Sequence, residues 1–228
     1  LRRGVDVLMV ASCQASLEDF YEPGDERTPY ILFDRNFSQT PAHFVGSDDV
    51  QVGEIATEHL IDIGRTRIAH IGGKNTSPSV GRLNGYKKAL ASHRLPVRAE
   101  AIVARDRVEE TGDLQGFQAM QELLALKARP DAVFCYNDLT AVGAMEATLK
   151  AGLRIPEDIA FIGCGNFRYA DYLRVPLSSI DHGTAELGRI AGEFALDLSA
   201  NPGQPVRSIL TQSRLVVRES SVRASGSK

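Results

Sequence analysis

PDAVFCYNDLTAVGAMEATLKAGLRIPEDIAFIGCGN, residues Pro130–Asn166, predicts one complete strand–helix–strand unit. Asp131–Tyr136 is rich in β-favouring residues, and Asn137-Asp138 after it can cap a helix. In the expected helix, the apolar residues recur at helical spacing, and they are Leu139, Val142, Met145 and Leu149. Gly152 provides a helix stop, and Ile159–Gly163 predicts the second strand.

Polar residues follow both strands of this unit. A right-handed crossover makes the two strands parallel, so that their polar ends lie on the same edge of one sheet. Ligands of open α/β sheets bind beyond the carboxyl ends of the strands. Asn137, Asp138 and Asn166 are therefore the first candidates for a small-molecule site. Asn and Asp at such turns are as often simple helix caps, and the local sequence leaves both interpretations open.

The composition is that of an ordinary globular protein. The chain has 228 residues, of which 43% are hydrophobic and 24% charged, which is enough for one large α/β domain or two lobes. A net charge of −3 argues against wrapping of nucleic acid by this chain alone, and leaves a local basic patch open. No segment approaches the roughly 18 apolar residues of a membrane helix. The first residue is Leu, so we expect that the natural start can lie upstream.

The three cysteines, Cys13, Cys135 and Cys164, lie in or beside apolar runs and form no CxxC pair. This pattern favours buried, reduced thiols in a cytoplasmic protein over a disulfide framework or a metal site.

Strands alternate with helices along the rest of the chain, which implies parallel sheets. The expected strands are Gly4–Ala11, Pro29–Asp34, Phe44–Gly46, Arg67–Gly72, Ala101–Ala104 and one or two within Ser208–Val217. The expected helices are a short one within Gln14–Thr28, one capped by Ser47-Asp48-Asp49, Arg82–Ser92, Leu114–Leu126 and one capped by Thr184. One doubly wound sheet and two smaller sheets both fit this pattern.

Five segments resemble, in the family's order, the effector-binding core of lactose/galactose-repressor-type (LacI/GalR family) transcriptional regulators. They are SDDVQVGEIATEHLIDIGRTRIAHIGG (Ser47–Gly73), RLNGYKKAL (Arg82–Leu90), PDAVFCYNDLTAVGAM (Pro130–Met145), GLRIPEDIAFIG (Gly152–Gly163) and LVVRESS (Leu215–Ser221). The resemblance extends over essentially the whole chain. It implies a two-lobed α/β fold with parallel sheets, similar to the type I periplasmic sugar-binding proteins, and an effector in the cleft between the lobes.

The resemblance also implies a division of the chain. Residues 1–63 and 182–208 would form the N-terminal lobe, residues 64–181 and 209–221 the C-terminal lobe, and residues 222–228 a flexible tail. Family members carry a DNA-binding helix-turn-helix, a hinge and two strand–helix units before the segment that matches Gly4–Ala11. We therefore expect an incomplete N-terminal lobe, and a chain that is a fragment of a longer regulator.

The family's ligand residues match individual positions here. Arg82 matches an arginine that reaches into the cleft and binds the effector by charge-assisted hydrogen bonds, the alternative being a surface arginine. Asn137 matches a cleft asparagine, and Asp48 matches an acidic position at the cleft edge, where capping is an equally good role. Further lining candidates are Ser12, Asp106 and His182. The last of these lies at a lobe crossing, where hinge hydrogen bonding is an equal alternative.

Cys164-Gly165-Asn166 departs from the family pattern. Many members have an aromatic residue, then Asp, then Asp or Asn here, and the first Asp binds sugar hydroxyls or a purine edge. Because Gly165 has no side chain, either Asn166 or a neighbour replaces that contact, or the effector is not a conventional neutral sugar. The lost carboxylate beside Arg82 favours an acidic or phosphorylated effector. Tyr136 and Phe167 could offer a ring face to a sugar or base, although aromatic residues at strand ends are more often core.

The predicted function is that of the effector-binding sensor domain of a DNA-binding transcriptional regulator. A sugar, sugar derivative or nucleobase would control operator binding allosterically. The implied partners are operator DNA, through a helix-turn-helix outside this chain, and a second copy in a homodimer, with no membrane. The alternative is an exported solute-binding receptor of a transport system, which requires an export signal upstream.

Enzyme motifs are missing from the sequence. It contains no G-x-S-x-G, no P-loop and no H-E-x-x-H, and its five histidines show no zinc-ligand spacing. We therefore expect neither catalysis nor a cofactor or metal.

Overall fold

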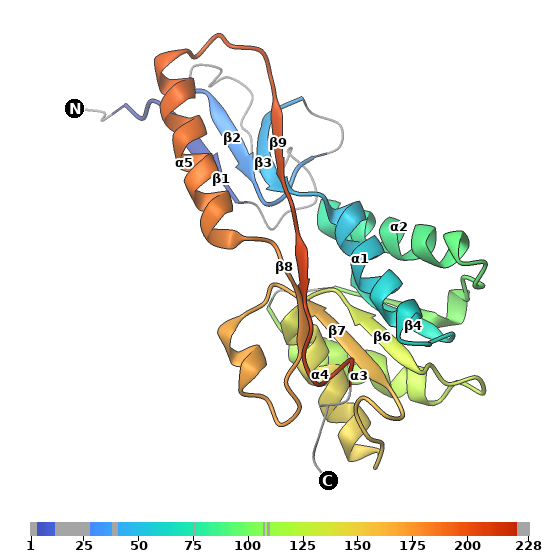
Figure 1. Ribbon diagram of the computed structural model, residues 1–228. Coiled ribbons are helices and arrows are strands. Elements are labelled where there is room, and N and C mark those ends of the chain that lie inside the picture. The colour runs from blue at the N-terminus through green and yellow to red at the C-terminus, as the bar shows by residue number, and fades with distance from the viewer. Residues whose placement is uncertain are drawn as a thin grey trace. The chain divides into compact units, whose positions relative to one another are not determined.

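The computed structural model describes residues 4–11, 28–37, 41–74, 76–106, 108 and 110–222 (Figure 1). The chain forms two compact units, each built from separate stretches of sequence. The first contains Leu1–Asp48, Asn75–Pro78 and His182–Gln212, and the second contains Asp49–Lys74, Ser79–Asp181 and Ser213–Lys228. Both are α/β, in agreement with the predicted fold class.

The first unit has a four-stranded parallel sheet with the order β1-β2-β3-β9. The strands are β1 (Leu8–Val10), β2 (Tyr30–Phe33), β3 (His43–Ser47) and β9 (Ser208–Thr211). Helix α5 (Thr184–Ala200) covers one face of the sheet (Figure 1). Its buried residues recur every three or four positions and pack on Ile31 and Val45, and they are Leu187, Ala191, Phe194 and Leu198.

The second unit has a six-stranded sheet with the order β10-β8-β7-β6-β4-β5. Its strands are β4 (Ile68–Gly73), β5 (Ile102–Arg105), β6 (Ala132–Cys135), β7 (Ala160–Cys164), β8 (Ser178–Asp181) and β10 (Arg214–Val216). The first five are parallel, and β10 is antiparallel to β8. The carboxyl ends of five strands therefore lie on one edge of this sheet.

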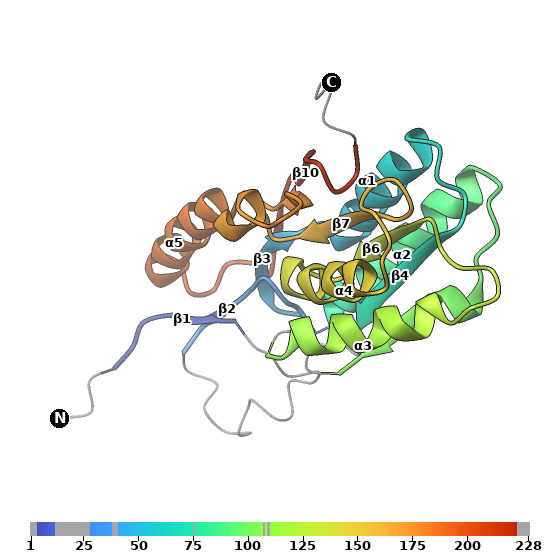
Figure 2. The same cartoon turned by 90° about the horizontal axis from the view of Figure 1, so that it is seen from below.

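Helices cover both faces of the second sheet (Figure 2). They are α1 (Asp49–Asp62), α2 (Ser77–Ser92), α3 (Gly112–Leu124) and α4 (Asp138–Lys150), with short 3-10 turns η1 (Ala99–Ala101) and η2 (Arg168–Asp171). Alternate residues of a strand point to opposite faces, so Phe134 packs beneath α1 and α2 whereas Val133 packs beneath α3 and α4.

Helices α1 and α2 pack backbone against backbone. A Cβ atom added to Gly53 would lie 2.1 Å from the carbonyl oxygen of Arg82, and one added to Gly85 would lie 2.0 Å from that of Val50. Glycine is therefore required at both positions, because any side chain would force the helices apart.

The central prediction is confirmed. β6, α4 and β7 form the expected unit, the two strands pair in parallel, and Asn137 is the cap of α4. α2 starts at Ser77 rather than at the predicted Arg82, because a proline such as Pro78 fits the first turn of a helix. α5 is capped by Gly183, in a left-handed conformation, rather than by Thr184. The helix expected within Gln14–Thr28 lies outside the described residues except for Thr28.

The bounds of the two units differ from those of the predicted lobes at residues 48–49, at Asn75–Pro78 and at residues 212–213. The first change of unit is at Asp48–Asp49 rather than at residues 63–64, because Val52 and Leu60 of α1 pack against strands of the second sheet. The chain re-enters the first unit at Asp181–His182, and its last change of unit is at residues 212–213. The predicted lobes themselves stay a prediction. The predicted tail, residues 222–228, lies outside the described residues except for Val222.

His70 is a buried titratable group in the second core. Its ring stacks between Tyr86 and Phe134, at centroid distances of 5.4 and 4.9 Å, and Nδ1 donates to the Phe134 carbonyl oxygen at 3.0 Å. Nε2 is buried and, within the described part of the chain, has no hydrogen-bond partner. Burial lowers the pKa of His70 to about 4.

Acid should therefore destabilise the fold through His70. Between pH 6.5 and 4, His70 is protonated in the unfolded chain and neutral in the folded protein, so the free energy of unfolding falls as the pH falls. At pH 4.5 the loss through this group is about 2–3 kcal/mol relative to pH 7. Urea denaturation at both pH values should show His70→Phe losing less stability on acidification than the parent protein.

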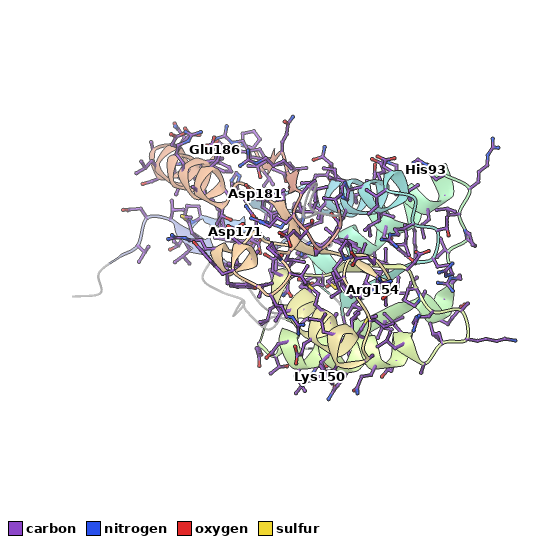
Figure 3. The ribbon with its side chains drawn as sticks, turned by 60° about the horizontal axis from the view of Figure 1, so that its bottom comes forward. His93, Lys150, Arg154, Asp171, Asp181 and Glu186 are labelled. Carbon is purple, nitrogen blue, oxygen red and sulfur yellow. The ribbon has the colours of Figure 1, made fainter. Side chains whose placement is uncertain are left out.

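His93, which is exposed (Figure 3), provides the matched control. His93→Phe should keep the parent pH dependence. An unchanged acid loss in His70→Phe would show that this histidine is not the group responsible.

Candidate functional site

Polar residues gather at the carboxyl edge of the second sheet. Lys74 follows β4, Asp106 follows β5, Asn137 lies beyond β6 and Asn166 lies beyond β7. Because these strands are parallel, the structure brings Asp106, Asn137 and Asn166 to one edge of a single unit. The sequence predicted this common edge for Asn137 and Asn166.

Arg82 reaches the same edge from α2. Its side chain is buried, Nε donates to Asp49 Oδ1 at 2.9 Å, and Nη1 donates to the Tyr136 carbonyl oxygen at 2.7 Å. The guanidinium carbon also lies 4.8 Å from the centroid of the Tyr136 ring. The alternative of a surface arginine is therefore wrong. Arg82 is fixed at the end of β6 by an ion pair and a backbone contact.

Asn137 is a helix cap. Oδ1 accepts a hydrogen bond from the Thr140 backbone N–H at 2.8 Å, and Nδ2 donates to the Val108 carbonyl oxygen at 3.2 Å. Both ends of the amide thus have partners within the protein. Its side chain is only partly buried, and its contact with an effector stays a prediction.

Asp138, the third residue first considered, is a buried brace. Its Oδ1 accepts from Ser179 Oγ at 2.5 Å and its Oδ2 accepts from the Phe167 backbone N–H at 2.9 Å. Burial raises the pKa of Asp138, although these hydrogen bonds oppose the shift. The carboxylate is fully buried, and its two hydrogen bonds join α4 to β8 and to the segment after β7.

Gly165 and Asn166 form a left-handed turn after β7, with φ of +126° and +50°. Asn166 Oδ1 accepts from Arg218 Nη2 at 2.8 Å, and its backbone N–H donates to Ser179 Oγ at 2.9 Å. The Asn166 side-chain oxygen, one of the alternatives for replacing the missing carboxylate, is thus bound to Arg218. An effector contact by Asn166 remains a prediction.

The other predicted residues are more scattered. Asp106 is exposed and pairs with Lys74 at 3.0 Å. In the first unit, Asp48 directly precedes α1 and is partly buried. His182 is buried, and its backbone carbonyl oxygen accepts from Thr211 Oγ1 at 3.5 Å. The two roles considered for its side chain stay predictions. Ser12 lies outside the described residues.

Sequence reasoning missed Arg218 as a residue of this edge. Its Nη1 donates to the Leu177 carbonyl oxygen at 2.8 Å, Nη2 binds Asn166, and Nε binds Asp171, which Figure 3 labels. The LVVRESS motif was recognised only as part of a family pattern. Its spacing gave no sign that the arginine reaches the end of β7.

The serines around Arg218 complete a buried network. Ser178 Oγ accepts from the Arg218 backbone N–H at 2.7 Å and lies 2.7 Å from Ser221 Oγ. Ser220 Oγ donates to the Phe161 carbonyl oxygen at 2.7 Å, and His59 Nε2 lies 2.9 Å from Ser221 Oγ. The C-terminal segment thereby fixes β7, β8 and α1 to one another.

Other candidate features do not add a site. Cys135 and Cys164 are buried and form no disulfide with each other, as expected, and burial raises the pKa of the Cys135 thiol. Cys13 lies outside the described residues. Among the residues that the structure describes, no cluster of His, Cys, Asp or Glu could hold a metal ion, and no helix is long and apolar enough to cross a membrane. A cavity on α4 has a mainly apolar lining, and none of the predicted site residues belongs to it. It is lined by Val142, Met145, Glu146, Leu149, Leu173, Arg174 and Val175.

Residues 57–221 match the family described as periplasmic binding protein-like domain. Among solved structures, a complex of the transcriptional regulator CelR with cellobiose is 28% identical, with a TM-score of 0.83 over 96% of this chain and 67% of that one. A LacI-family regulatory protein from Chloroflexus aggregans is also 28% identical, with a TM-score of 0.82 over 95% of this chain and 77% of that one. The chain belongs to the LacI/GalR family.

Curated relatives from the LacI/GalR family are repressors by name. The ribose operon repressor of Haemophilus influenzae is 36% identical over 193 residues, which are 84% of this chain and 57% of that protein. The probable repressor ExuR of Bacillus subtilis is 30% identical over 215 residues, 94% of this chain and 63% of that protein. The chain thus spans about three fifths of their length. The alternative of an exported solute receptor is not favoured by these relatives.

Removal of the Arg218 side chain should destabilise the second unit strongly. Arg218→Ala leaves the Leu177 carbonyl oxygen and Asn166 Oδ1 without their donor in a largely buried place, and we expect a loss of about 2–4 kcal/mol in the free energy of unfolding. Urea denaturation measures this loss.

Arg214 is the matched control, because it forms only an exposed pair with Asp181 at 3.0 Å. Arg214→Ala should cost less than about 1 kcal/mol. Equal losses in the two variants would contradict the assigned role of Arg218.

Proposed function

We propose that this chain is the effector-binding part of a transcriptional regulator. A small ring-shaped molecule, such as a sugar, a sugar derivative or a nucleobase, binds at the carboxyl edge of the second sheet. Its binding energy shifts the equilibrium between conformations that differ in affinity for operator DNA. The observation that carries this proposal is the buried, pre-positioned Arg82 at the end of β6, in a chain whose relatives are repressors.

The arrangement around Arg82 supports a hydrogen-bonding role toward the effector. A long side chain normally loses conformational entropy when it is fixed on binding. Asp49 and the Tyr136 carbonyl oxygen already hold this guanidinium in place, so that cost is met on folding. A fixed arginine at the sheet edge therefore favours a ligand of defined shape.

The charge around Arg82 favours a neutral effector over the acidic or phosphorylated one considered from sequence. Its guanidinium is paired with the Asp49 carboxylate at 2.9 Å, which leaves the pair close to neutral. Lys74, the other cation noted at this edge, is paired with Asp106. A solved LacI-family neighbour carries phosphate, and that binding is a property of that protein.

The remaining parts of the proposal concern the whole regulator. Operator DNA would bind through a helix-turn-helix outside this chain, the protein would act as a homodimer, and it would work in the cytoplasm without catalysis. These parts rest on the family and on the names of the relatives.

Effector binding should depend on the Arg82–Asp49 pair. Arg82→Ala alone would strand a poorly exposed carboxylate and lower the free energy of unfolding by about 3 kcal/mol, so the double variant Arg82→Met/Asp49→Asn is the better test. D-Ribose, cellobiose and hypoxanthine serve as probes in thermal denaturation. At least one should raise the melting temperature of the parent protein, and the double variant should lose this rise.

The exposed pair of Arg154 (Figure 3) and Asp158 supplies the control. Arg154→Met/Asp158→Asn removes the same two charges in the same unit and should keep the full ligand-induced rise. A full rise in the Arg82→Met/Asp49→Asn variant would contradict the site. A parent protein that no probe stabilises would contradict the proposed effector class.

A further inference from the structure

Two aromatic rings are exposed just after β7. The ring of Phe167 stacks on that of Tyr169, with centroids 5.7 Å apart and planes inclined by only 8°. Phe167 is 56% exposed and Tyr169 is 38% exposed, whereas Tyr136, at the end of the neighbouring strand β6, is 3% exposed. Of the two aromatic residues noted in the sequence, Tyr136 thus belongs to the core and Phe167 does not.

The position of the Phe167 ring is fixed from both sides. Its backbone N–H donates to the buried Asp138 carboxylate at 2.9 Å, which anchors the residue directly after Asn166. The ring lies over Gly165, because a Cβ atom added to that glycine would be 2.8 Å from Cε2 and 3.1 Å from Cδ2. The ring therefore occupies the space that a side chain at position 165 would need.

Gly165 and the Phe167 ring are close neighbours. With φ at +126°, position 165 strongly favours glycine, and a side chain there would also have to displace the ring. An aromatic face therefore lies beside the polar contacts at this end of β7.

We propose that Phe167, supported by Tyr169, is a specificity-determining platform that binds the flat, apolar face of a ring-shaped effector. This inference rests on the proposed effector site and names the chemistry of one of its walls. The C–H face of a cyclic sugar and the plane of a nucleobase both fit an aromatic face, and an acyclic polyol presents no such face.

Scattered exposed apolar residues are normal in proteins, but this pair is not scattered. The rings are stacked, Phe167 directly follows Asn166 at the sheet edge, and its backbone N–H is bound to the buried Asp138. The negative face of an aromatic ring also repels anions, which agrees with the neutral charge of the Arg82–Asp49 pair. Two separate features of this edge thus favour the same class of ligand.

The first experiment removes the ring and keeps an apolar side chain. The purified protein and its Phe167→Leu variant are titrated with D-ribose, cellobiose, hypoxanthine and the acyclic polyol ribitol. The parent should bind at least one ring compound more tightly than ribitol, and Phe167→Leu should weaken that binding about three- to tenfold. If Phe167→Leu weakens the binding of hypoxanthine and not of a sugar, the effector is of the nucleobase class.

The second experiment keeps an aromatic ring at position 167 and uses its fluorescence to detect ligand binding. The chain contains no tryptophan, so Phe167→Trp introduces a single tryptophan, at the platform, whose emission can be followed separately from that of the tyrosines. This variant should retain the parent's affinity, and its emission should change on addition of the bound ring compound. Tyr172→Leu and Tyr172→Trp are the matched controls, since Tyr172 is 81% exposed in the same segment. Both variants should keep the parent's affinity, and the tryptophan emission of Tyr172→Trp should not change on ligand addition.

The outcomes separate the platform from the proposed function. Unchanged affinity in Phe167→Leu, with binding lost in Arg82→Met/Asp49→Asn, would overturn the platform and leave the effector site standing. Equal binding of ribitol and the ring compounds would also overturn it. A parent protein that binds no ring compound would overturn both proposals.

Discussion

Backbone contact between α1 and α2 is the constraint on which the candidate site depends. Gly53 and Gly85 allow the two helices to approach until a side chain at either position would collide with a carbonyl oxygen. This approach puts Asp49, the first residue of α1, within 2.9 Å of Arg82 on α2. Their ion pair then lies at the end of β6 rather than in solvent. A larger distance between the helices would separate the two charges, and each would then be solvated by water instead of paired with the other.

A buried polar framework supports the same edge from the other side. Asp138 joins α4 to Ser179, and Arg218 joins the C-terminal segment to Asn166. Such groups stabilise a fold only when their hydrogen bonds are satisfied, because an unpaired polar atom is costly in a low dielectric. Because the protein itself supplies these hydrogen-bond partners, several predicted ligand residues are already bound to other residues of the chain. The edge is first a rigid scaffold, and ligand contacts must be added to it.

Local periodicity predicted most of the fold, since alternating strands and helices require parallel sheets whose carboxyl ends coincide. It limited the cap of α4 to Asn137 or Asp138, of which the structure shows Asn137, and the resemblance drew attention to Arg82. Contacts distant in sequence could not be predicted in the same way. Arg82 meets Asp49 across 33 positions and Arg218 meets Asn166 across 52, and no spacing rule links them. The sequence placed α1 in the N-terminal lobe whereas α1 lies in the second unit, because an apolar stripe does not specify which sheet it covers.

The selectivity proposed for this edge follows from charges that are already balanced. An anion at Arg82 would compete with the Asp49 carboxylate, and two like charges about 4 Å apart repel by roughly 4 kcal/mol at an effective dielectric near 20. A neutral hydroxyl or amide avoids that repulsion and still binds the oriented dipoles of the pair. The exposed ring of Phe167 adds an apolar face beside these polar groups. A neutral ring with one apolar face and a polar rim satisfies both conditions, and neither an anion nor a flexible chain does.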